Sequence, residues 1–254
     1  MRENTVETLR QKEYIDRLRV LYSEKAKALG RPCTYHIETF GCQMNAKDSE
    51  KFAGILQKAG CMPASEDEAD FVLYNTCTVR ENANLKVYGH LGKLRHEKKS
   101  GRNGLKIALC GCMMQEPDEI EKILKEHSFV DLIFGTHNIH RFAELVYRME
   151  TGNGPVVEVW PEAKEIVEDL PSERKYRFKA GVNIMFGCNN FCSYCIVPYV
   201  RGRERSREAS EVLSEIERLS KEGVREVMLL GQNVNSYGNT LEEKVSFAEL
   251  LKRT

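Results

Sequence analysis

Short apolar segments alternate with longer amphipathic segments over residues 31–150 of the chain. The segment after the first apolar run places Phe52, Ile55 and Ala59 at helical spacing and ends at Gly60, which predicts a helix with a glycine stop. The apolar or β-branched runs that predict strands are 34–41, 71–76, 106–111 and 131–136. Strand–helix alternation at this pitch predicts an α/β fold with a doubly wound parallel sheet.

A similar alternation returns near the C-terminal end of the sequence. Apolar runs predict strands at 182–186 and 226–230, and amphipathic segments predict helices at 209–222 and 246–253. Two βα units are too few to close a barrel or an ordinary sheet, so we expect an incomplete array. The predicted domains are a helical extension, an α/β domain, a linker and an incomplete βα domain, at 1–30, 31–150, 151–179 and 180–254.

The predicted N-terminal helix is highly charged, with Val20, Leu21 and Leu29 as its apolar positions and Gly30 after it. This composition is typical of a helix on the surface of a domain. We therefore expect an accessory helix and assign it no chemistry.

Composition narrows the class of protein. The 254 residues include 38 Lys+Arg and 38 Asp+Glu, so a polyanion would have to bind at a local basic patch. No apolar run approaches the roughly 18 residues that span a bilayer, and the N-terminus has no secretory signature, so we expect a cytoplasmic protein without a membrane partner. Nine cysteines in a reducing compartment favour packing, catalysis or metal binding over disulfides.

Three of these cysteines, Cys188, Cys192 and Cys195, lie in one polar loop directly after a predicted strand. Three thiolates within eight residues can converge on one soft metal centre. They would hold three corners of a four-iron, four-sulfur cube and leave one iron open to a small molecule. A structural zinc site would need a fourth ligand nearby, and the loop supplies none.

Three further cysteines, Cys42, Cys77 and Cys112, each follow a predicted strand and are spaced 35 residues apart. Parallel strands end at the same edge of a sheet, so these thiols should line one edge. The spacing leaves two interpretations open, a second metal cluster or three buried thiols. Cys110 competes with Cys112 because both lie on one face of a strand. We prefer Cys112 because it lies at the end of that strand, and we interpret the remaining three, Cys33, Cys61 and Cys110, as structural.

Two groups of basic residues have an open interpretation, either solvated faces or phosphate contacts. One follows the cysteine loop and contains Arg201, Arg203, Arg205 and Arg207. The other lies on and after the second predicted helix and contains Lys86, Lys93, Arg95, Lys98, Lys99 and Arg102. The six histidines are scattered and are interpreted as ordinary surface or helix residues.

Five motifs in order resemble the methylthiotransferases, a family of radical S-adenosylmethionine (SAM) enzymes. The Cys188–Cys195 loop, with Tyr194 before its last cysteine, resembles the radical SAM signature. The five segments that carry the resemblance to the methylthiotransferases are 39–45 (TFGCQMN), 75–81 (NTCTVRE), 111–115 (GCMMQ), 197–207 (VPYVRGRERSR) and 229–237 (LLGQNVNSY). The residues after Cys42 favour the branch that acts on dimethylallyladenosine in tRNA.

The resemblance implies two 4Fe-4S clusters, an auxiliary one on Cys42, Cys77 and Cys112 and a SAM-binding one on the cysteines of the loop. It implies that a methylthio group is added to C2 of N6-dimethylallyladenosine at tRNA position 37, with tRNA and a reductant such as flavodoxin or ferredoxin as partners of a monomer. Tyr194, Gly231, Gln232 and Asn233 are implied SAM contacts, and the four arginines of 201–207 are candidate contacts to the RNA.

The family's barrel has more strands than this sequence, so residues 180–254 are expected to be the first βα units of an incomplete radical SAM (β/α) barrel. The chain is thus expected to represent part of a longer enzyme. Two alternatives stay open. One is a sister methylthiotransferase that acts on threonylcarbamoyl-adenosine or a ribosomal protein. The other is a non-catalytic module that binds iron–sulfur clusters.

Overall fold

The structure of the chain is a computed structural model that describes residues 3–78, 81–163 and 165–254. The chain divides into two compact units, Met1–Glu173 and Arg174–Thr254. This boundary falls inside the stretch 151–179 that the sequence predicts as a linker. Most of that stretch therefore belongs to the first unit. At the end of this unit, the amide of Glu173 donates a hydrogen bond to the carbonyl of Glu50.

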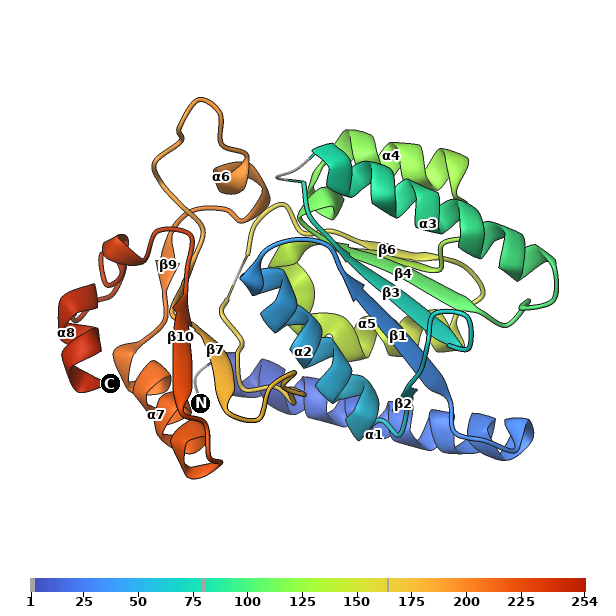
Figure 1. Ribbon diagram of the computed structural model, residues 1–254, viewed down its shortest axis with the longest axis horizontal. Coiled ribbons are helices and arrows are strands. Elements are labelled where there is room, and N and C mark those ends of the chain that lie inside the picture. The colour runs from blue at the N-terminus through green and yellow to red at the C-terminus, as the bar shows by residue number, and fades with distance from the viewer. Residues whose placement is uncertain (1–2, 79–80, 164) are drawn as a thin grey trace. The chain divides into compact units, whose positions relative to one another are not determined.

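The first unit is built on a six-stranded sheet with every neighbouring pair parallel, in the order β2-β1-β3-β4-β5-β6 (Figure 1). The strands are β1 (Thr34–Thr39), β2 (Met62–Pro63), β3 (Phe71–Thr76), β4 (Lys106–Gly111), β5 (Leu132–Phe134) and β6 (Val156–Glu158). The order runs outward from β3 to β6 in one direction and from β1 to β2 in the other. The prediction of a doubly wound parallel sheet is confirmed, and the direction of winding reverses between β1 and β3.

Helices cover both faces of this sheet. The helical segments are α1 (Glu3–Leu29), α2 (Gln43–Lys58), α3 (Glu81–Lys99), η1 (Cys112–Gln115), α4 (Pro117–Glu126), η2 (Thr136–Arg141) and α5 (Phe142–Thr151). One face carries α1, α2 and α5, and the other carries α3 and α4 (Figure 1). Successive side chains of β3 alternate between the two cores, Phe71 and Leu73 in the first and Val72 and Tyr74 in the second.

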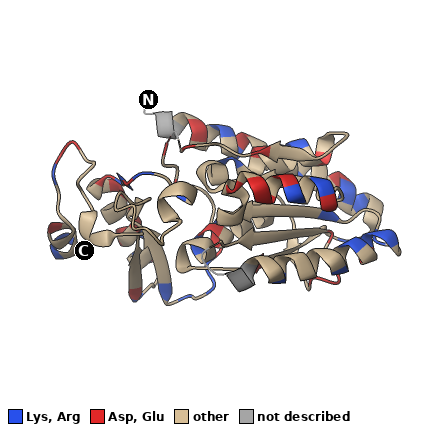
Figure 2. Cartoon of the chain, turned by 90° about the horizontal axis from the view of Figure 1, so that it is seen from above, with Lys and Arg blue, Asp and Glu red and all other residues tan. Residues whose placement is uncertain are grey.

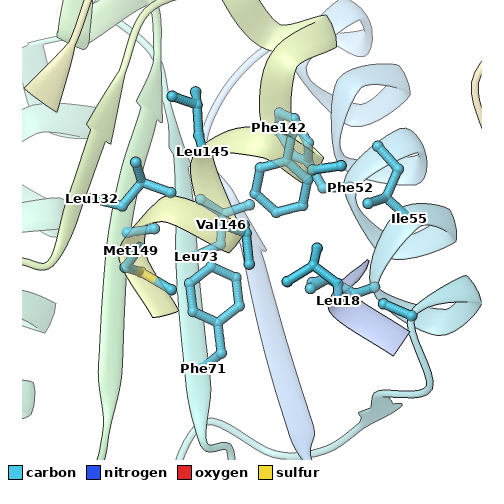
Figure 3. Packing of buried hydrophobic residues seen from close by; sticks show 14 of the residues in the cluster. Leu18, Phe52, Ile55, Phe71, Leu73, Leu132, Phe142, Leu145, Val146 and Met149 are labelled. Atoms are coloured by element: carbon cyan, nitrogen blue, oxygen red, sulfur yellow. The ribbon is translucent and has the colours of Figure 1, made fainter. Parts of the chain in front are cut away.

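The larger core contains three aromatic rings that contact one another, Phe52 of α2, Phe134 of β5 and Phe142 of α5. Their centroids lie 4.6–5.7 Å apart, with tilted or edge-on geometry. Figure 3 shows Phe52 beside Phe142. Leu18 of α1 and Leu145 of α5 extend the same cluster. Aromatic pairs of this geometry add stabilisation beyond the apolar area they bury, so α1, α2 and α5 are fixed to one face.

The N-terminal helix is not the surface accessory that the sequence predicts. Ile15, Leu18 and Tyr22 of α1 are buried in the larger core, whereas Val20 and Leu29, two of the predicted apolar positions, are exposed. The buried positions follow helical spacing but are separated by charged residues. Because α1 has few apolar residues, its sequence alone does not show which face of the helix points to the core. Within the described residues, no helix combines the length and apolar character needed to cross a membrane.

The second unit has two parallel strands joined through a helix, as predicted. Its elements are β7 (Lys179–Asn183), β8 (Met185–Phe186), α6 (Val197–Val200), β9 (Arg205–Ser206), α7 (Ala209–Lys221), β10 (Glu226–Leu230), η3 (Val234–Ser236) and α8 (Phe247–Arg253). β7 pairs with β10, and β8 pairs with β9 in antiparallel fashion (Figure 1). Val182, Val212 and Leu250 lie in its small core, which also contains Tyr237 and Leu241 from the segment after β10.

Candidate functional site

Three cysteines lie at the carboxyl ends of three adjacent strands in the first unit. Cys42 follows β1 and is the N-cap residue of α2, Cys77 follows β3, and Cys112 opens η1 after β4. Because Thr76 pairs with Gly111, Cys77 and Cys112 follow partnered positions of neighbouring strands. Doubly wound sheets bind ligands outside the carboxyl ends of their strands, where the winding reverses. Cys42 and Cys77 flank that position.

Two glycines allow the backbone segments at this edge to approach closely. Gly41 has φ +143°, and a Cβ built there would lie 2.7 Å from the Cβ of Cys77. Gly111 has φ +97°, and its Cβ would lie 2.3 Å from the carbonyl oxygen of Thr76. No larger residue fits without displacing these neighbours. The loop that carries Cys42 therefore lies directly against Cys77.

A buried amide joins the same segments. The Nδ2 group of Asn45 donates to the carbonyl of Thr76 at 2.7 Å, and the Cys42 thiol lies 3.5 Å from Asn45 Oδ1. Asn75 donates in turn to the carbonyl of Asn45 at 2.8 Å and to Ser49 Oγ at 3.0 Å. Asn45 and Asn75 were not among the predicted site residues. Their position inside cysteine-containing motifs was the available signal.

The donor set at this edge consists of soft sulfur atoms. Cys77 and Cys112 are buried and Cys42 is exposed. Among the described residues, no three Cys, His, Asp or Glu side chains are close enough to hold a single metal ion. A four-iron cube binds each thiolate through a different iron, so its ligands lie farther apart than those of one ion. Three thiols on neighbouring strand ends fit that requirement better than a zinc site, which needs four converging ligands.

The other cysteines of the first unit lie elsewhere. Cys33 and Cys61 precede β1 and β2, at the opposite edge of the sheet, and burial raises the pKa of both thiols. A raised pKa disfavours the thiolate that metals and electrophiles require. Cys110 is fully buried inside β4. These positions match the structural roles that the sequence predicts for all three.

The second trio of cysteines lies in the loop between β8 and α6. The Cys188 amide donates to the carbonyl of Gly202 at 3.1 Å, and the Cys195 amide donates to the carbonyl of Cys192 at 2.9 Å. Cys188 is buried, Cys195 is half-buried and Cys192 is exposed. The loop therefore curls back on itself, and its three cysteines range from buried to exposed.

Side chains on both flanks close this loop. The amide of Glu204 donates to Asn189 Oδ1 at 3.1 Å, and the amide of Asn189 lies 3.4 Å from Glu204 Oε1. At the start of the loop, Gly187 has φ +74°, and a Cβ there would lie 2.1 Å from the carbonyl oxygen of Arg203. Phe191, the residue before Cys192, has φ +46°, an unusual value for a bulky residue.

The predicted SAM contacts fall into two groups. Gln232 Oε1 accepts a hydrogen bond from the Gly187 amide at 2.6 Å, so the loop after β10 lies against the start of the cysteine loop. Gly231 packs closely on Met185, where a Cβ would come within 2.6 Å of that side chain. Asn233 is bonded to Ser236 within its own turn. Tyr194 is 89% exposed, and no contact described here orients it.

The four arginines predicted as RNA contacts do not form one basic surface. Arg207 is buried, and its Nη1 lies 2.7 Å from both Glu215 Oε2 and the carbonyl of Asn183, so its role is structural rather than phosphate binding. Arg201 is also buried. Burial, and then the charge of Arg201, lowers the pKa of Arg205. Arg203 alone of the four is exposed, with its guanidinium carbon 4.4 Å from the Phe191 ring centroid.

Three of the six residues in the second basic group, Lys93, Lys98 and Arg102, form ion pairs with acidic side chains. Lys93 pairs with Glu66 and Asp67, and Lys98 pairs with Asp131. Figure 2 shows basic and acidic residues interleaved along α1, whereas the basic residues of α3 gather towards its C-terminal end. These contacts favour the solvated-face interpretation for this group.

Two family models match the chain. Residues 34–135 match the Uncharacterized protein family UPF0004, and residues 182–253 match the Radical SAM superfamily. The chain therefore has a region similar to UPF0004 ahead of a region similar to the Radical SAM superfamily. The first region contains Cys42, Cys77 and Cys112, and the second contains the end of β7, the cysteine loop and β10.

Curated proteins that share one name are similar to this chain. A tRNA-2-methylthio-N(6)-dimethylallyladenosine synthase of Lachnoclostridium phytofermentans is 63% identical over 227 residues, 89% of this chain and 50% of that protein. A protein with the same name from Clostridium tetani is 56% identical over 220 residues, 86% of this chain and 48% of that protein. The predicted resemblance to the methylthiotransferases is confirmed. The chain spans about half the length of the curated relatives it matches.

Among solved structures, the radical S-adenosylmethionine methyltransferase TsrM from Kitasatospora setae, with tryptophan substrate and a SAM analogue bound, aligns with a TM-score of 0.46. The alignment has 14% identity and covers 80% of this chain and 48% of that one. This likeness is too slight to support a conclusion.

Proposed function

We propose that this chain forms the cluster-binding part of a tRNA methylthiotransferase, which adds a methylthio group to C2 of N6-dimethylallyladenosine at position 37. The observation that carries the proposal is the presence of two separate cysteine trios, one at three strand ends and one in a single loop. The names and identities of the relatives favour dimethylallyladenosine over threonylcarbamoyl-adenosine or a ribosomal protein as the substrate.

Under this proposal Cys42, Cys77 and Cys112 hold an auxiliary 4Fe-4S cluster, and the three cysteines of the 188–195 loop hold a second one. Each trio leaves one iron without a protein ligand. When bound, the clusters and SAM would supply the electron, the carbon radical that removes hydrogen from C2, and the sulfur. The protein's contribution is to hold the thiols in place and to bind the RNA.

Several side chains would orient the second site. Gln232 fixes the amide of Gly187 ahead of Cys188, and the pairing of Asn189 with Glu204 closes the loop. Tyr194, Gly231 and Asn233 remain our candidates for SAM contacts, with tRNA and a small electron-transfer protein as partners of a monomer. We expect Arg203 to contact RNA phosphate because it is exposed beside the loop.

Anaerobic reconstitution with iron and sulfide tests the two centres. The wild-type chain should bind about eight irons, and alanine replacement of either trio should leave about four. Cys110→Ala is a matched control, since it removes a buried thiol two residues from Cys112 without removing a proposed ligand. Binding of zinc alone, or equal iron loss in the control, would contradict the proposal.

Substrate choice needs a separate assay. The reconstituted protein is incubated with SAM, dithionite and tRNA that carries or lacks the dimethylallyl group, and the nucleosides are analysed by mass spectrometry. A methylthio product only on the dimethylallyl tRNA supports the proposal. Product on threonylcarbamoyl-adenosine instead would identify a sister enzyme, and iron binding with no SAM cleavage would indicate a non-catalytic module.

A further inference from the structure

The loops that carry Cys42 and Cys77 come from elements far apart in the sequence, and one buried side chain connects them. Asn45 lies in the first turn of α2, three residues after Cys42, and is fully buried. Its Nδ2 group lies 2.7 Å from the carbonyl of Thr76, 3.3 Å from Asn75 Oδ1 and 3.4 Å from the carbonyl of Phe40. Its Oδ1 lies 3.5 Å from the Cys42 thiol.

Asn45 contacts the chain segments that carry two proposed ligands, Cys42 and Cys77. These segments lie on either side of the position where the winding of the sheet reverses. Phe40 and Cys42 belong to the loop after β1, whereas Thr76 immediately precedes Cys77. Asn75 strengthens the connection by donating to the carbonyl of Asn45. A buried amide that bonds to two chain segments fixes their separation, because breaking those bonds would leave unsatisfied polar groups in the interior.

The same network reaches the third ligand. Thr76 Oγ1 donates to the carbonyl of Cys110 at 2.5 Å, and Asn75 Oδ1 lies 2.7 Å from the position that a Cβ on Gly111 would occupy. The backbone that precedes Cys112 therefore packs against the two residues that Asn45 holds. Displacement of Asn45 would be transmitted to all three thiols.

We propose that Asn45 is a positioning residue for the auxiliary centre, which sets the spacing of Cys42, Cys77 and Cys112 so that they can bind one cluster together. This inference rests on the proposed function. Asn45 Oδ1 accepts a hydrogen bond from the Cys42 thiol. A thiolate that binds iron would lack this proton, and the Nδ2 contacts of Asn45 would still hold the two loops.

The structure offers a matched control in Asn138, which is also fully buried in the first unit. Asn138 Oδ1 accepts from the amide of Gly135 at 3.1 Å, and its Nδ2 donates to the carbonyl of Glu158 at 2.7 Å. Neither bond involves a residue next to Cys42, Cys77 or Cys112. Asn138→Ala therefore removes buried hydrogen bonds of the same kind at the ends of β5 and β6.

The experiment uses the full chain with Cys188, Cys192 and Cys195 replaced by alanine, so that all bound iron reports on the auxiliary centre. Asn45→Ala and Asn138→Ala are compared for iron content, rate of iron loss to a chelator, EPR signal of the reduced cluster and melting temperature without metal. We expect Asn45→Ala to lose iron at least about tenfold faster and to change the EPR signal, because its ligands are misplaced. Asn138→Ala should lower the melting temperature and leave the other readouts unchanged.

Asn45→Ser is a milder second variant, since its hydroxyl can still donate one hydrogen bond, and it should give an intermediate rate of iron loss. Equal iron loss and an unchanged EPR signal in the Asn45 and Asn138 variants would overturn the inference, because Asn45 would then be only structural. Absence of iron from the parent chain itself is a different result. It would overturn the proposed function, and the assignment of Asn45 would fall with it.

Discussion

The two cysteine trios are assembled in opposite ways. Cys188, Cys192 and Cys195 lie within one loop, whose shape depends on local bonds and on a few contacts to residues 202–204 and 232. The other trio is drawn from three strand ends that span 71 positions of the sequence. The first arrangement needs one correctly folded loop, whereas the second needs a correctly ordered sheet.

This difference indicates where each site is vulnerable. A change in sheet register would separate Cys77 from Cys112 but would leave the 188–195 loop unaffected. A change in the loop backbone would have the opposite effect. Substitutions in the two units should therefore separate the two sites experimentally.

The largest effects are expected at two glycines. Gly111→Ala and Gly187→Ala each place a Cβ on a residue with positive φ, within 2.3 and 2.1 Å of a backbone oxygen respectively. We expect each to lower the unfolding free energy of its own unit by about 4 kcal/mol and to remove iron from its own site only. Gly60→Ala is the control, since it has φ +95° in open space and should cost about 1 kcal/mol. Denaturant unfolding and iron analysis measure both effects, and loss of iron from both sites in one variant would contradict the separation.

The next effect concerns the second unit alone. Arg207→Ala leaves Glu215 as a buried carboxylate without its guanidinium partner, because the two side chains are 4% and 10% exposed. Removing one member of a buried pair typically costs about 3 kcal/mol or more. Hydrogen exchange of α7 and β10 should speed up while exchange in β3 and β4 does not change. An unchanged rate of hydrogen exchange in α7 would show that this ion pair does not stabilise the unit.

Acid should destabilise the first unit selectively, because all six histidines lie in it. Burial lowers the pKa of His140 to about 4, with smaller contributions from Arg141 and Lys51. An unfolded histidine titrates near about 6.5, so between these values the unfolded chain takes up a proton that the folded unit does not.

Unfolding free energy should therefore fall by about 3 kcal/mol as the pH drops from about 6.5 towards 4, and the part of this fall above about pH 5 precedes the titration of most carboxylates. The single tryptophan, Trp160, lies 5.5 Å from the His140 ring, so its fluorescence reports on this unit. His140→Gln should flatten the pH dependence. If the pH dependence of the unfolding free energy persists in this variant, groups other than His140 cause it.

The smallest effect on stability is expected at Arg203, which is exposed. Arg203→Ala should change the unfolding free energy by less than about 0.5 kcal/mol. If Arg203 contacts RNA phosphate, affinity for an anticodon stem–loop should fall and the slope of log K against log salt should decrease by about 1. Fluorescence anisotropy at several salt concentrations measures this. An unchanged slope would remove Arg203 from the RNA interface.

Regular elements with strong patterns were predictable from the sequence. The predicted bounds of β3 and β4 match the structure because both strands are almost wholly buried and their apolar runs end at polar or glycine residues. β2 was missed because it has two exposed residues, one of them proline, at the edge of the sheet. The predicted strand 182–186 is in the structure the end of β7, which begins at Lys179, followed by the separate β8. β9 was missed because it has only two residues.

The cysteine positions were predictable from their spacing, since strand ends of a parallel sheet share one edge. The winding reversal between β1 and β3 was not, because strand order depends on which helix covers which face. Sequence also treated Arg203 and Arg207 as equivalent. Only the packing of Glu215 against Arg207 shows that one arginine is structural and the other is accessible.

The burial of α1 has a practical consequence for anyone who dissects this protein. The UPF0004 match covers residues 34–135 and leaves out both α1 and α5, which supply Leu18, Tyr22 and Phe142 to the larger core. A gene fragment trimmed to that match would expose the apolar side of the sheet to water and should accumulate in inclusion bodies. The smallest soluble piece is expected to start at or before residue 3 and to continue to residue 173.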